Sequence, residues 1–398
     1  MSRFVTIFRK EFTDTIRDRR TLFMMIVFPL LLVPVLMIVM TNLQRSSMKK
    51  AEEKVLRVAL VARGNAAVLV GALTGHHDFR VIDGIPADSM EAMILRDSVD
   101  AAVVVAGDFD AAVARMASGK IRLFYKSSDD FDMVKRRLSD VIGAYEKQLV
   151  ADRFVKLKLD AGIVNPVTIE EHDVASMKER IGKTVGGMFP YLFVIFCFMG
   201  AMYPAIDLAA GEKERGTMET LLTAPVSRFQ ILLGKFAVVV LTGLLSAAVS
   251  IIGILFAVRQ ISDIPPEMLD AVMAILDVQT VVLVLSLLFP LSMFFAAFLL
   301  SMSIFARSYK EAQSMISPLM IVVILPVMIG LFPGVTLGPL TAMIPILNVS
   351  LATKEIIAGT VKTGLLLEVY ASLILLAGLS LFGCARWFQR EETIFRGV

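Results

Sequence analysis

The sequence predicts a polytopic α-helical membrane protein with six transmembrane helices and a small α/β domain inserted between the first two of them. Of the 398 residues, 56% are hydrophobic and only 19% are charged, which is not the composition of a soluble chain. Several uncharged runs reach the roughly 20 residues that a helix needs to cross a bilayer. The first two runs are separated by a long stretch of ordinary soluble composition. We therefore expect membrane helices before and after a folded domain.

The predicted spans account for most of the apolar residues. They cover about residues 22–41, 185–206, 231–258, 280–305, 312–331 and 364–384. The first contains Pro29 and Pro34, which membrane helices tolerate, and it lacks a cleavage site, so we interpret it as an uncleaved anchor. The last holds one internal acid, Glu368. Cys197 and Cys384 both lie in apolar runs, which excludes a disulfide framework.

Basic residues in the short connections predict which side of the membrane the chain ends occupy. One set of connections, including both tails, is rich in them: Arg9, Lys10, Arg17, Lys213, Arg215, Arg228, Arg307, Lys310 and Arg386. The opposite set holds Arg259, Lys354 and Lys362. The positive-inside rule then places both termini in the cytoplasm and the inserted domain outside it. Basic residues that flank the inserted domain argue the other way, but long domains cross membranes largely regardless of charge.

The inserted domain, residues 42–184, alternates between strand and helix patterns. Strands are expected at 55–61, 79–82, 101–105 and 121–125, with a last one near 167–169, and helices at 66–73, 89–96, 110–116 and 132–159. This alternation predicts a small α/β domain with a partly parallel sheet. By the topology above, the domain is extracytoplasmic.

The sequence offers little catalytic or metal chemistry. His76, His77 and Asp78 could ligate a metal, and so could the acidic and histidine residues at 170–173, but neither group has helical ligand spacing, and we interpret both as solvated loops. HExxH and GxSxG are absent, and one imitation of a phosphate-binding loop lacks the motif's first glycine because Met177 stands there. A net charge of +3 gives no reason to expect nucleic-acid binding. We therefore expect no catalytic residue and no metal site.

The N-terminal segment, residues 1–21, predicts an amphipathic helix. Phe4, Phe8, Phe12 and Ile16 lie four apart, while arginines and lysine occupy other faces. We expect this helix to lie in the cytoplasmic headgroup layer and to lead into the first span. A charged tail whose aromatic residues are incidental is the alternative.

The segment after the second span, near 211–225, carries the signals of a short cytoplasmic helix. Thr217 is the candidate N-cap, Glu219 lies in the first turn, and Pro225 ends the segment. These signals predict a helix over about 218–224 that is exposed on the cytoplasmic surface. On capping alone, a connector with no role is not excluded.

Two strings in the chain resemble a known transporter family. The string EKERGTMETLLTAPVSRFQILLGK, residues 212–235, closely resembles the coupling segment of type 2 ABC export permeases. The string RKEFTDTIRDRRTLF, residues 9–23, resembles their N-terminal connecting helix. With six spans and a large domain between the first two, the chain looks most like the NatB branch, the membrane subunits of sodium-extruding ABC transporters.

The resemblance implies an export permease in a bacterial cytoplasmic (inner) membrane, with sodium as the candidate substrate. ATP hydrolysis is then expected in a separate ATP-binding subunit that also holds the ATP and Mg²⁺, and this chain is expected to carry no cofactor. Six spans resemble half of a transporter, so a second copy of the permease is expected. The residues that match the family's coupling region, which docks on the ATP-binding subunit, are Glu212, Glu214, Gly216, Thr217 and Glu219.

The stretch near 332–363 is apolar but interrupted by prolines and glycines. Non-helical backbone at membrane depth survives only when it is buried in protein or lines a cavity. We interpret the stretch as a re-entrant helical hairpin that dips in from the outer side before the last span, as in permeases of this family; a surface loop is the alternative. Glu355 in this hairpin and Glu368 in the last span are the candidate acids of a cation pathway.

Other functions remain to be compared with the ATP-driven permease. An ABC exporter of a hydrophobic or amphipathic compound, such as a drug, lipid or peptide, would share every feature above. A secondary transporter should carry ionisable residues at the bilayer midplane and repeated spans, and the sequence has neither. A membrane-anchored sensor would need a cytoplasmic output domain, whereas the longest cytoplasmic segment has only about 20 residues. The ABC permease is therefore favoured.

Overall fold

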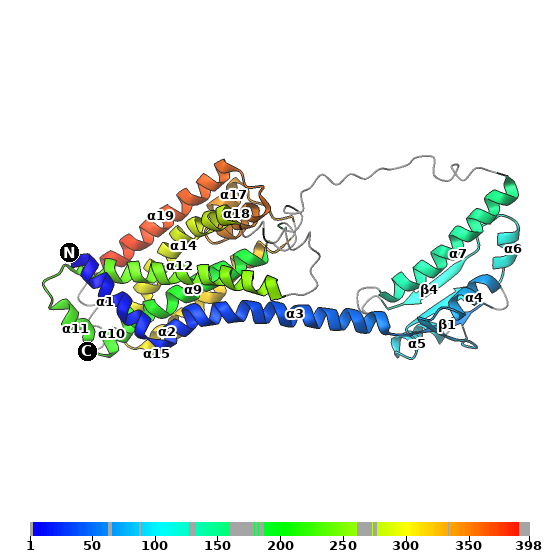
Figure 1. Cartoon of the computed structure of the whole chain (residues 1–398), viewed down its shortest axis with the longest axis horizontal. Helices are drawn as coiled ribbons and strands as arrows, with labels where there is room; N and C mark the ends of the chain where they lie inside the picture. Colours follow the sequence, from blue (N-terminus) through cyan, green and yellow to red (C-terminus); the bar gives the residue numbers. More distant parts are fainter. Residues whose placement is uncertain are drawn as a thin grey trace. The chain divides into compact units, whose positions relative to one another are not determined.

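The computed structural model describes residues 3–62, 66–86, 89–126, 133–158, 179, 182, 187–260, 273, 277–332 and 334–389. The chain forms two compact units (Figure 1). The membrane unit comprises Met1–Met40 and Asp173–Val398, and the inserted domain comprises Thr41–His172.

Helices make up the membrane unit. They are α1 (Arg3–Arg17), α2 (Arg19–Leu22), η1 (Phe23–Val27), the first part of α3 (Phe28–Glu53), α9 (Met188–Ile206), η5 (Asp207–Gly211), α10 (Glu212–Glu214), α11 (Thr217–Leu222), α12 (Arg228–Gln260), α14 (Val278–Phe305), α15 (Tyr309–Ile316), α16 (Leu319–Ile329), α17 (Pro339–Met343), α18 (Leu347–Ala358) and α19 (Thr363–Phe388). Among the described residues, six stretches are long and apolar enough to cross a bilayer: Arg19–Leu43, Met188–Glu214, Arg228–Gln260, Val278–Phe305, Tyr309–Ile329 and Thr363–Phe388. Each contains most of one predicted span, so the six predicted apolar helices are confirmed.

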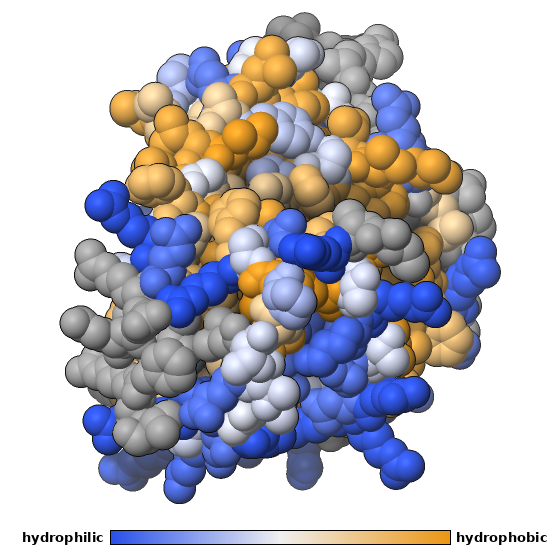
Figure 2. Space-filling model, turned by 90° about the vertical axis from the view of Figure 1, so that its left-hand side faces the viewer, coloured by the Kyte–Doolittle hydropathy of each residue, from blue (hydrophilic) through white to orange (hydrophobic). Residues whose placement is uncertain are grey.

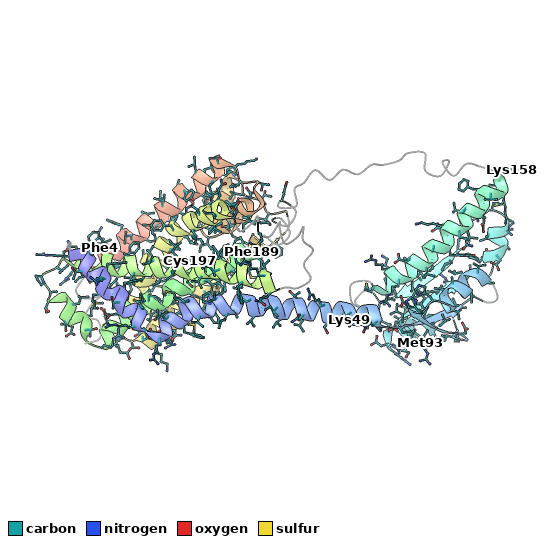
Figure 3. All side chains as sticks on the ribbon, in the orientation of Figure 1. Phe4, Lys49, Met93, Lys158, Phe189 and Cys197 are labelled. Atoms are coloured by element: carbon teal, nitrogen blue, oxygen red, sulfur yellow. The ribbon has the colours of Figure 1, made fainter. Side chains whose placement is uncertain are left out.

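The centre of the membrane unit is α9, which packs against α12 and α14. Figure 3 labels Phe189 and Cys197 on this helix, and both side chains are buried. Small residues allow the close approach of α9 and α12: a Cβ added at Gly200 would lie 2.4 Å from the Cβ of Ser246. By contrast, α16 exposes Ile321 and other large apolar side chains, as expected of a helix that faces lipid.

Two of the spans contain π-helical turns. One is η1 in the first span, and the other is η5, which follows Pro204 at the end of α9. Proline removes one backbone hydrogen bond, and π-turns of this kind occur mainly at functional positions in helices. The second π-turn lies directly before the charged residues of α10.

The inserted domain is built on a four-stranded sheet with the order β2-β1-β3-β4. The strands are β1 (Leu56–Val61), β2 (Phe79–Ile82), β3 (Ala101–Val105) and β4 (Ile121–Tyr125), and the helices are α4 (Ala67–Thr74), α5 (Met90–Leu95), α6 (Phe109–Ala114) and α7 (Met133–Leu157). The strand β1 pairs in parallel with β2 and β3, and β4 is antiparallel to β3. The predicted partly parallel α/β sheet is confirmed. The strand predicted near 167–169 and the cluster at 170–173 lie outside the described residues.

Both faces of this sheet are covered. On one face Val58 and Val103 pack with residues of α4, α6 and α7, and on the other Ala59 and Val104 pack with α5. Asp100, a buried residue just before β3, pairs with half-exposed basic residues: its carboxylate accepts hydrogen bonds from the backbone N–H of Arg57 at 2.8 Å and from its Nε at 3.1 Å. Lys54 Nζ lies 2.9 Å from the same carboxylate.

The stretch predicted as a re-entrant hairpin contains the two short helices α17 and α18. Most residues of α18 are buried, and the helix packs against α9, α14 and α19. The backbone between the two helices breaks at Ile346, which has a φ of 71°. Buried Asn348 donates from Nδ2 to the carbonyl oxygen of Ala342 at 2.9 Å and so ties α18 to α17. The depth of this pair in the membrane stays a prediction.

Candidate functional site

The helix α1 packs against the start of α12 along a stripe that is only partly apolar. Its buried residues are Ile7, Glu11 and Thr15, which lie four apart. A Cβ added at Gly234 would lie 2.5 Å from Cγ2 of Ile7, so the absence of a side chain there permits the close approach. Lys235 follows, and its Nζ donates to Glu11. The predicted N-terminal helix is confirmed, but the face it buries carries a carboxylate.

The phenylalanines that were predicted to form the apolar face lie beside this stripe. Phe4, Phe8 and Phe12 are half-buried and stack in series, with ring centroids 6.3 and 5.7 Å apart. Ile16 is exposed. The helix ends at Arg17, and Asp18 caps α2 by accepting hydrogen bonds from two of its amides. The position of α1 in the headgroup layer stays a prediction.

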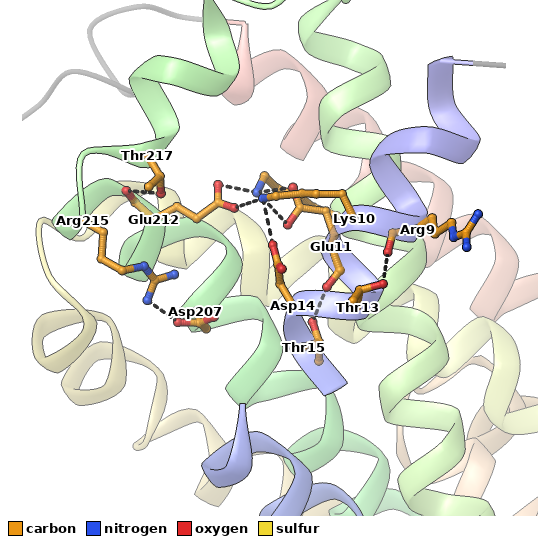
Figure 4. Close-up of polar contacts among 11 residues, drawn as sticks. Arg9, Lys10, Glu11, Thr13, Asp14, Thr15, Asp207, Glu212, Arg215 and Thr217 are labelled. Atoms are coloured by element: carbon orange, nitrogen blue, oxygen red, sulfur yellow. Dashed lines mark hydrogen bonds and ion pairs between the residues drawn. The ribbon is translucent and has the colours of Figure 1, made fainter. Parts of the chain in front are cut away.

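Four side chains form a charge cluster where α1, α10 and α12 meet: Lys10, Glu11, Glu212 and Lys235, of which Figure 4 labels the first three. Lys235 Nζ donates to Glu212 Oε2 at 2.6 Å and to Glu11 Oε1 at 3.1 Å. Lys10 Nζ lies 3.0 Å from Glu212 Oε1 and 3.3 Å from Glu11 Oε2. Each carboxylate therefore contacts both ammonium groups. Glu11, Lys235 and Glu212 are 0%, 1% and 4% exposed. The Lys10 side chain is 46% exposed, and its Nζ also lies 3.4 Å from Oδ2 of exposed Asp14.

Glu11, Glu212 and Lys235 can be buried because each carboxylate meets two ammonium groups and Lys235 meets both carboxylates. An isolated buried charge is costly, and a buried pair is tolerated only when its geometry is good. Burial is the main cause that raises the pKa of the Glu11 carboxyl, against the lowering effect of Lys235. Burial alone would lower the pKa of Lys10, but Glu11 and Glu212 outweigh it and raise that pKa above its usual value. Loss of any one member would leave an opposite charge buried without its full set of partners.

We call Glu212–Arg215 the junction segment. The side chain of each of these residues contacts a different element of the membrane unit. Glu212 enters the charge cluster. Lys213 Nζ donates to the carbonyl oxygens of Ile304 at 2.8 Å and Ala306 at 3.4 Å, at the C-terminus of α14. Glu214 Oε2 accepts from the backbone N–H of Tyr309 at 2.7 Å, at the N-terminus of α15. Unpaired backbone groups at helix ends need such partners, so the segment satisfies two helix termini at once.

The fourth residue of the junction segment turns back to its own span. Arg215 Nη1 donates to Asp207 Oδ1 at 2.8 Å and thereby holds the π-turn η5 against α10 (Figure 4). This hydrogen bond is the main reason that the pKa of Arg215 is raised above its usual value. Four consecutive residues thus connect the end of the second span to α1, α12, α14, α15 and η5.

The short helix α11 follows the junction segment, and two predictions about it need correction. The N-cap is Gly216, whose φ of 71° suits a glycine, and Thr217 is the first helical residue. The hydroxyl of Thr217 instead donates to the carbonyl oxygen of Glu212 at 3.2 Å. The prediction of an exposed helix holds for Glu219 but is wrong for Met218, which is buried; Glu212, ahead of the helix, is buried in the cluster.

A cleft of about 790 Å³ lies between α1, α11 and the start of α15. Its lining is strongly charged, and it includes Lys10, Asp14, Arg20, Asp207, Glu212, Arg215, Thr217 and Tyr309. Figure 2 shows this end of the membrane unit, where hydrophilic side chains gather below a region of hydrophobic ones. A charged cleft beside an exposed short helix can receive a protein surface of complementary charge.

The two acids predicted for the transport pathway lie apart from the junction segment in the chain. Glu355, near the end of α18, accepts a hydrogen bond at Oε1 from the backbone N–H of Leu337 at 2.9 Å. It lines a pocket of about 430 Å³ together with Lys354 and Lys362. Glu368 is exposed on α19 and is not among the described residues that line this pocket. A shared pathway for the two acids therefore stays a prediction.

Sequence reasoning did not single out Glu11 or Lys235. A signal for Lys235 was present, because a lysine inside the apolar run of the third span needs a partner. Glu11 lies four residues from both Ile7 and Thr15, but the phenylalanine stripe of the same helix gave the stronger amphipathic pattern. Which carboxylate meets Lys235 depends on contacts between segments more than 200 residues apart, which one sequence does not reveal.

Comparisons with known proteins agree with this architecture. The model of a family described as "ABC-2 family transporter protein" matches residues 19–384. The chain is 25% identical to the ABC transporter permease protein NatB of Bacillus subtilis (strain 168) over 396 residues, which covers 98% of each chain. A membrane unit of six apolar helices, a junction segment and a small inserted sheet are thus found in a chain whose nearly full length matches permeases. The protein belongs to the ABC-2 transporter family and is a multi-pass permease subunit of an ABC transporter.

Proposed function

We propose that this permease exports its substrate by coupling to a separate ATP-binding subunit that docks on α11 and the adjacent cleft. The observation that carries the proposal is the junction segment, which ties the exposed helix α11 to five other elements of the membrane unit. A surface helix with such connections is suited to pass a displacement inward. A plain connector would not need them.

The contacts of the junction segment suggest how a displacement of α11 would be transmitted to the other helices. Displacement of α11 would move α12 and α1 through Glu212, α14 through Lys213 and α15 through Glu214. Because Glu11, Glu212 and Lys235 are buried and closely bonded, pulling them apart would leave buried charges without partners, so the elements should move as one rigid body. ATP and Mg²⁺ would be held by the docked subunit, and this chain would supply the mechanical link. A second copy would complete the transporter, since six spans make half of one.

Docking can be tested by cross-linking. A cysteine that replaces exposed Glu219 should form a cross-link to the copurified ATP-binding subunit. Cysteine in place of Glu91, an exposed acid on α5 of the inserted domain, is the matched control and should form none. Cross-linking of both positions, or of the control alone, would contradict the proposed docking surface.

Docking of an ATP-binding subunit on α11 requires that the junction segment lie in the cytoplasm, and we propose that the inserted domain lies outside it. Gly107 lies in an exposed turn where an added side chain meets nothing within 4 Å. Gly107→Cys should react with an impermeant thiol reagent in intact cells. The two native cysteines, Cys197 and Cys384, are buried and should add little background. Labelling that requires a broken membrane would reverse the orientation and remove α11 from the side where ATP is.

Sodium is the substrate that we propose. Its support is the resemblance to the NatB branch and the two acids, Glu355 and Glu368, that flank the connection between α18 and α19. In inverted vesicles that contain both subunits, ATP should drive sodium uptake, and Glu368→Gln should reduce it far more than it reduces basal ATP hydrolysis. Glu91→Gln is the control. Transport of a hydrophobic compound without sodium would replace this substrate, and unchanged sodium uptake in Glu368→Gln would remove that acid from the pathway.

A further inference from the structure

A second group of chemically competent side chains lies in the inserted domain, in the tight turn between α4 and β2. His76, His77 and Asp78 each offer one ligand atom, and these atoms all lie within 4.8 Å of one another. The turn is anchored at its end, because the carbonyl oxygen of Asp78 accepts a hydrogen bond from the backbone N–H of Leu56 on β1 at 2.8 Å. The three side chains are therefore presented from a fixed backbone.

We propose that this turn binds a divalent transition-metal ion of the zinc type. Two imidazoles and one carboxylate are a common ligand set for Zn²⁺, and such sites often leave a fourth position for water or another ligand. In a tetrahedral site the ligand atoms lie about 3.4 Å apart. His77 Nε2 and Asp78 Oδ1 are already 3.0 Å apart, and His76 Nδ1 lies 3.9 Å from Asp78 Oδ2.

Little movement is needed to close the site. The side chain of His77 is 89% exposed, so its ring can rotate without displacing a neighbour. His76 is more constrained, because its ring stacks between His77 and Phe79, with centroids 5.0 and 4.9 Å away. The backbone N–H of Asp78 is 3.4 Å from His76 Nδ1, a long hydrogen bond that a metal ion at this nitrogen would replace.

The site opens onto a pocket, which is an independent reason to regard it as more than a solvated turn. His76 and Asp78 line a pocket of about 540 Å³ between α4 and α7. Asp140 on α7 lines the same pocket and brings a further carboxylate to it, and Tyr145 and Gln148 add other polar groups. An ion held at the turn would thus border a space large enough for a small ligand that contributes the remaining coordination position.

The test is zinc binding to the full-length protein in detergent after treatment with a chelator. Competition with a chromophoric zinc indicator should give one Zn²⁺ per chain. His76→Ala, His77→Ala and Asp78→Asn should each weaken binding about tenfold or more, since single changes around metal sites have effects of that order. His77→Ala is the sharpest variant, because removing so exposed a side chain cannot disturb the fold.

The chain also supplies its own control. It has three histidines, and His172→Ala removes the one that lies outside the turn. This variant should bind zinc like the unchanged protein. The proposal is overturned if the unchanged protein binds no zinc in competition with the indicator, if His77→Ala binds as tightly as the unchanged protein, or if the loss follows His172→Ala. None of these readouts depends on transport or on the ATP-binding subunit.

Discussion

Replacing Glu212 by glutamine should destabilise the membrane unit more than any exposed substitution nearby. The change keeps the shape of the side chain but removes one of the two buried negative charges of the charge cluster. Lys235, which is buried, would then keep only Glu11 as a partner at 3.1 Å. The free energy of unfolding falls because the Lys235 ammonium group stays buried with only one carboxylate partner.

The size of the effect follows from the geometry. At the 2.6 Å between Lys235 Nζ and Glu212 Oε2, two unit charges attract by roughly 6 kcal/mol at an effective dielectric constant of about 20. Relief of the Glu212 desolvation and of its repulsion with Glu11 offsets part of this. Breaking a buried pair by removing one partner typically costs about 3–5 kcal/mol. We therefore expect Glu212→Gln to lower the free energy of unfolding by about 3 kcal/mol.

Denaturant unfolding of the purified protein in mixed micelles measures the loss. Glu219→Gln, the same chemical change on exposed α11, is the matched control and should change stability by about 0.5 kcal/mol or less. The double variant Glu212→Gln with Lys235→Met leaves Lys10 and Glu11 as a balanced pair. It should be more stable than the sum of the single losses predicts, with a coupling energy of about 1–3 kcal/mol. The reasoning fails if Glu212→Gln unfolds like its control or if the two losses simply add.

Three further changes test other parts of the structure. In a thermal unfolding assay, Gly234→Val should lower stability by about 1–3 kcal/mol, because the added side chain forces α1 off α12. Gly71→Ala should cost nothing in the same assay, because a Cβ added there meets nothing within 4 Å. Lys213→Met leaves two carbonyl groups at the end of α14 without their donor and should lower transport per ATP hydrolysed, and an unchanged ratio would argue against that link. Burial alone would raise the pKa of Asp100, but hydrogen bonds from Arg57 and Lys54 outweigh it and lower the pKa to about 2. Because this pKa is depressed in the folded state, the stabilisation by Asp100 is present above pH ~4 and is lost as the pH falls towards 2. With such half-exposed partners the stabilisation amounts to about 1 kcal/mol. Hydrogen exchange of the β1 amides should report this pH dependence in the unchanged protein and should lack it in Asp100→Asn.

Much of the fold could be predicted because its signals are local. A run of about 20 apolar residues has few structural alternatives, so the six spans were found within a few residues. The four strands from Leu56 to Tyr125 were found for a similar reason, since short apolar runs bounded by polar turns mark buried strands. Even the parallel arrangement followed from the alternation of strand and helix.

The candidate site was predicted only in outline. The strings around Glu11 and Glu212 pointed to the right segments, but the partners of each charge depend on how α1 lies against α12. The N-cap of α11 was misassigned because threonine has a hydroxyl that can cap a helix and glycine has no side chain to do so. Gly216 instead follows Arg215, the C-cap of α10, and adopts the left-handed conformation that the sharp turn between the two helices requires. Glu355 and Glu368, the two acids of the proposed pathway, stay a prediction.

The π-turn η5 sets the angular phase of everything that follows it in the second span. A π-helical turn accommodates one residue more than an α-helical turn, and each residue advances the helix by about 100°. If the same five residues formed regular α-helix, Gly211 would point where Glu212 now points, and Glu212 would be turned about 100° away from the cluster. The cluster would then lose one of its two buried carboxylates. The order of charges in EKER is therefore meaningful only together with the π-turn ahead of it.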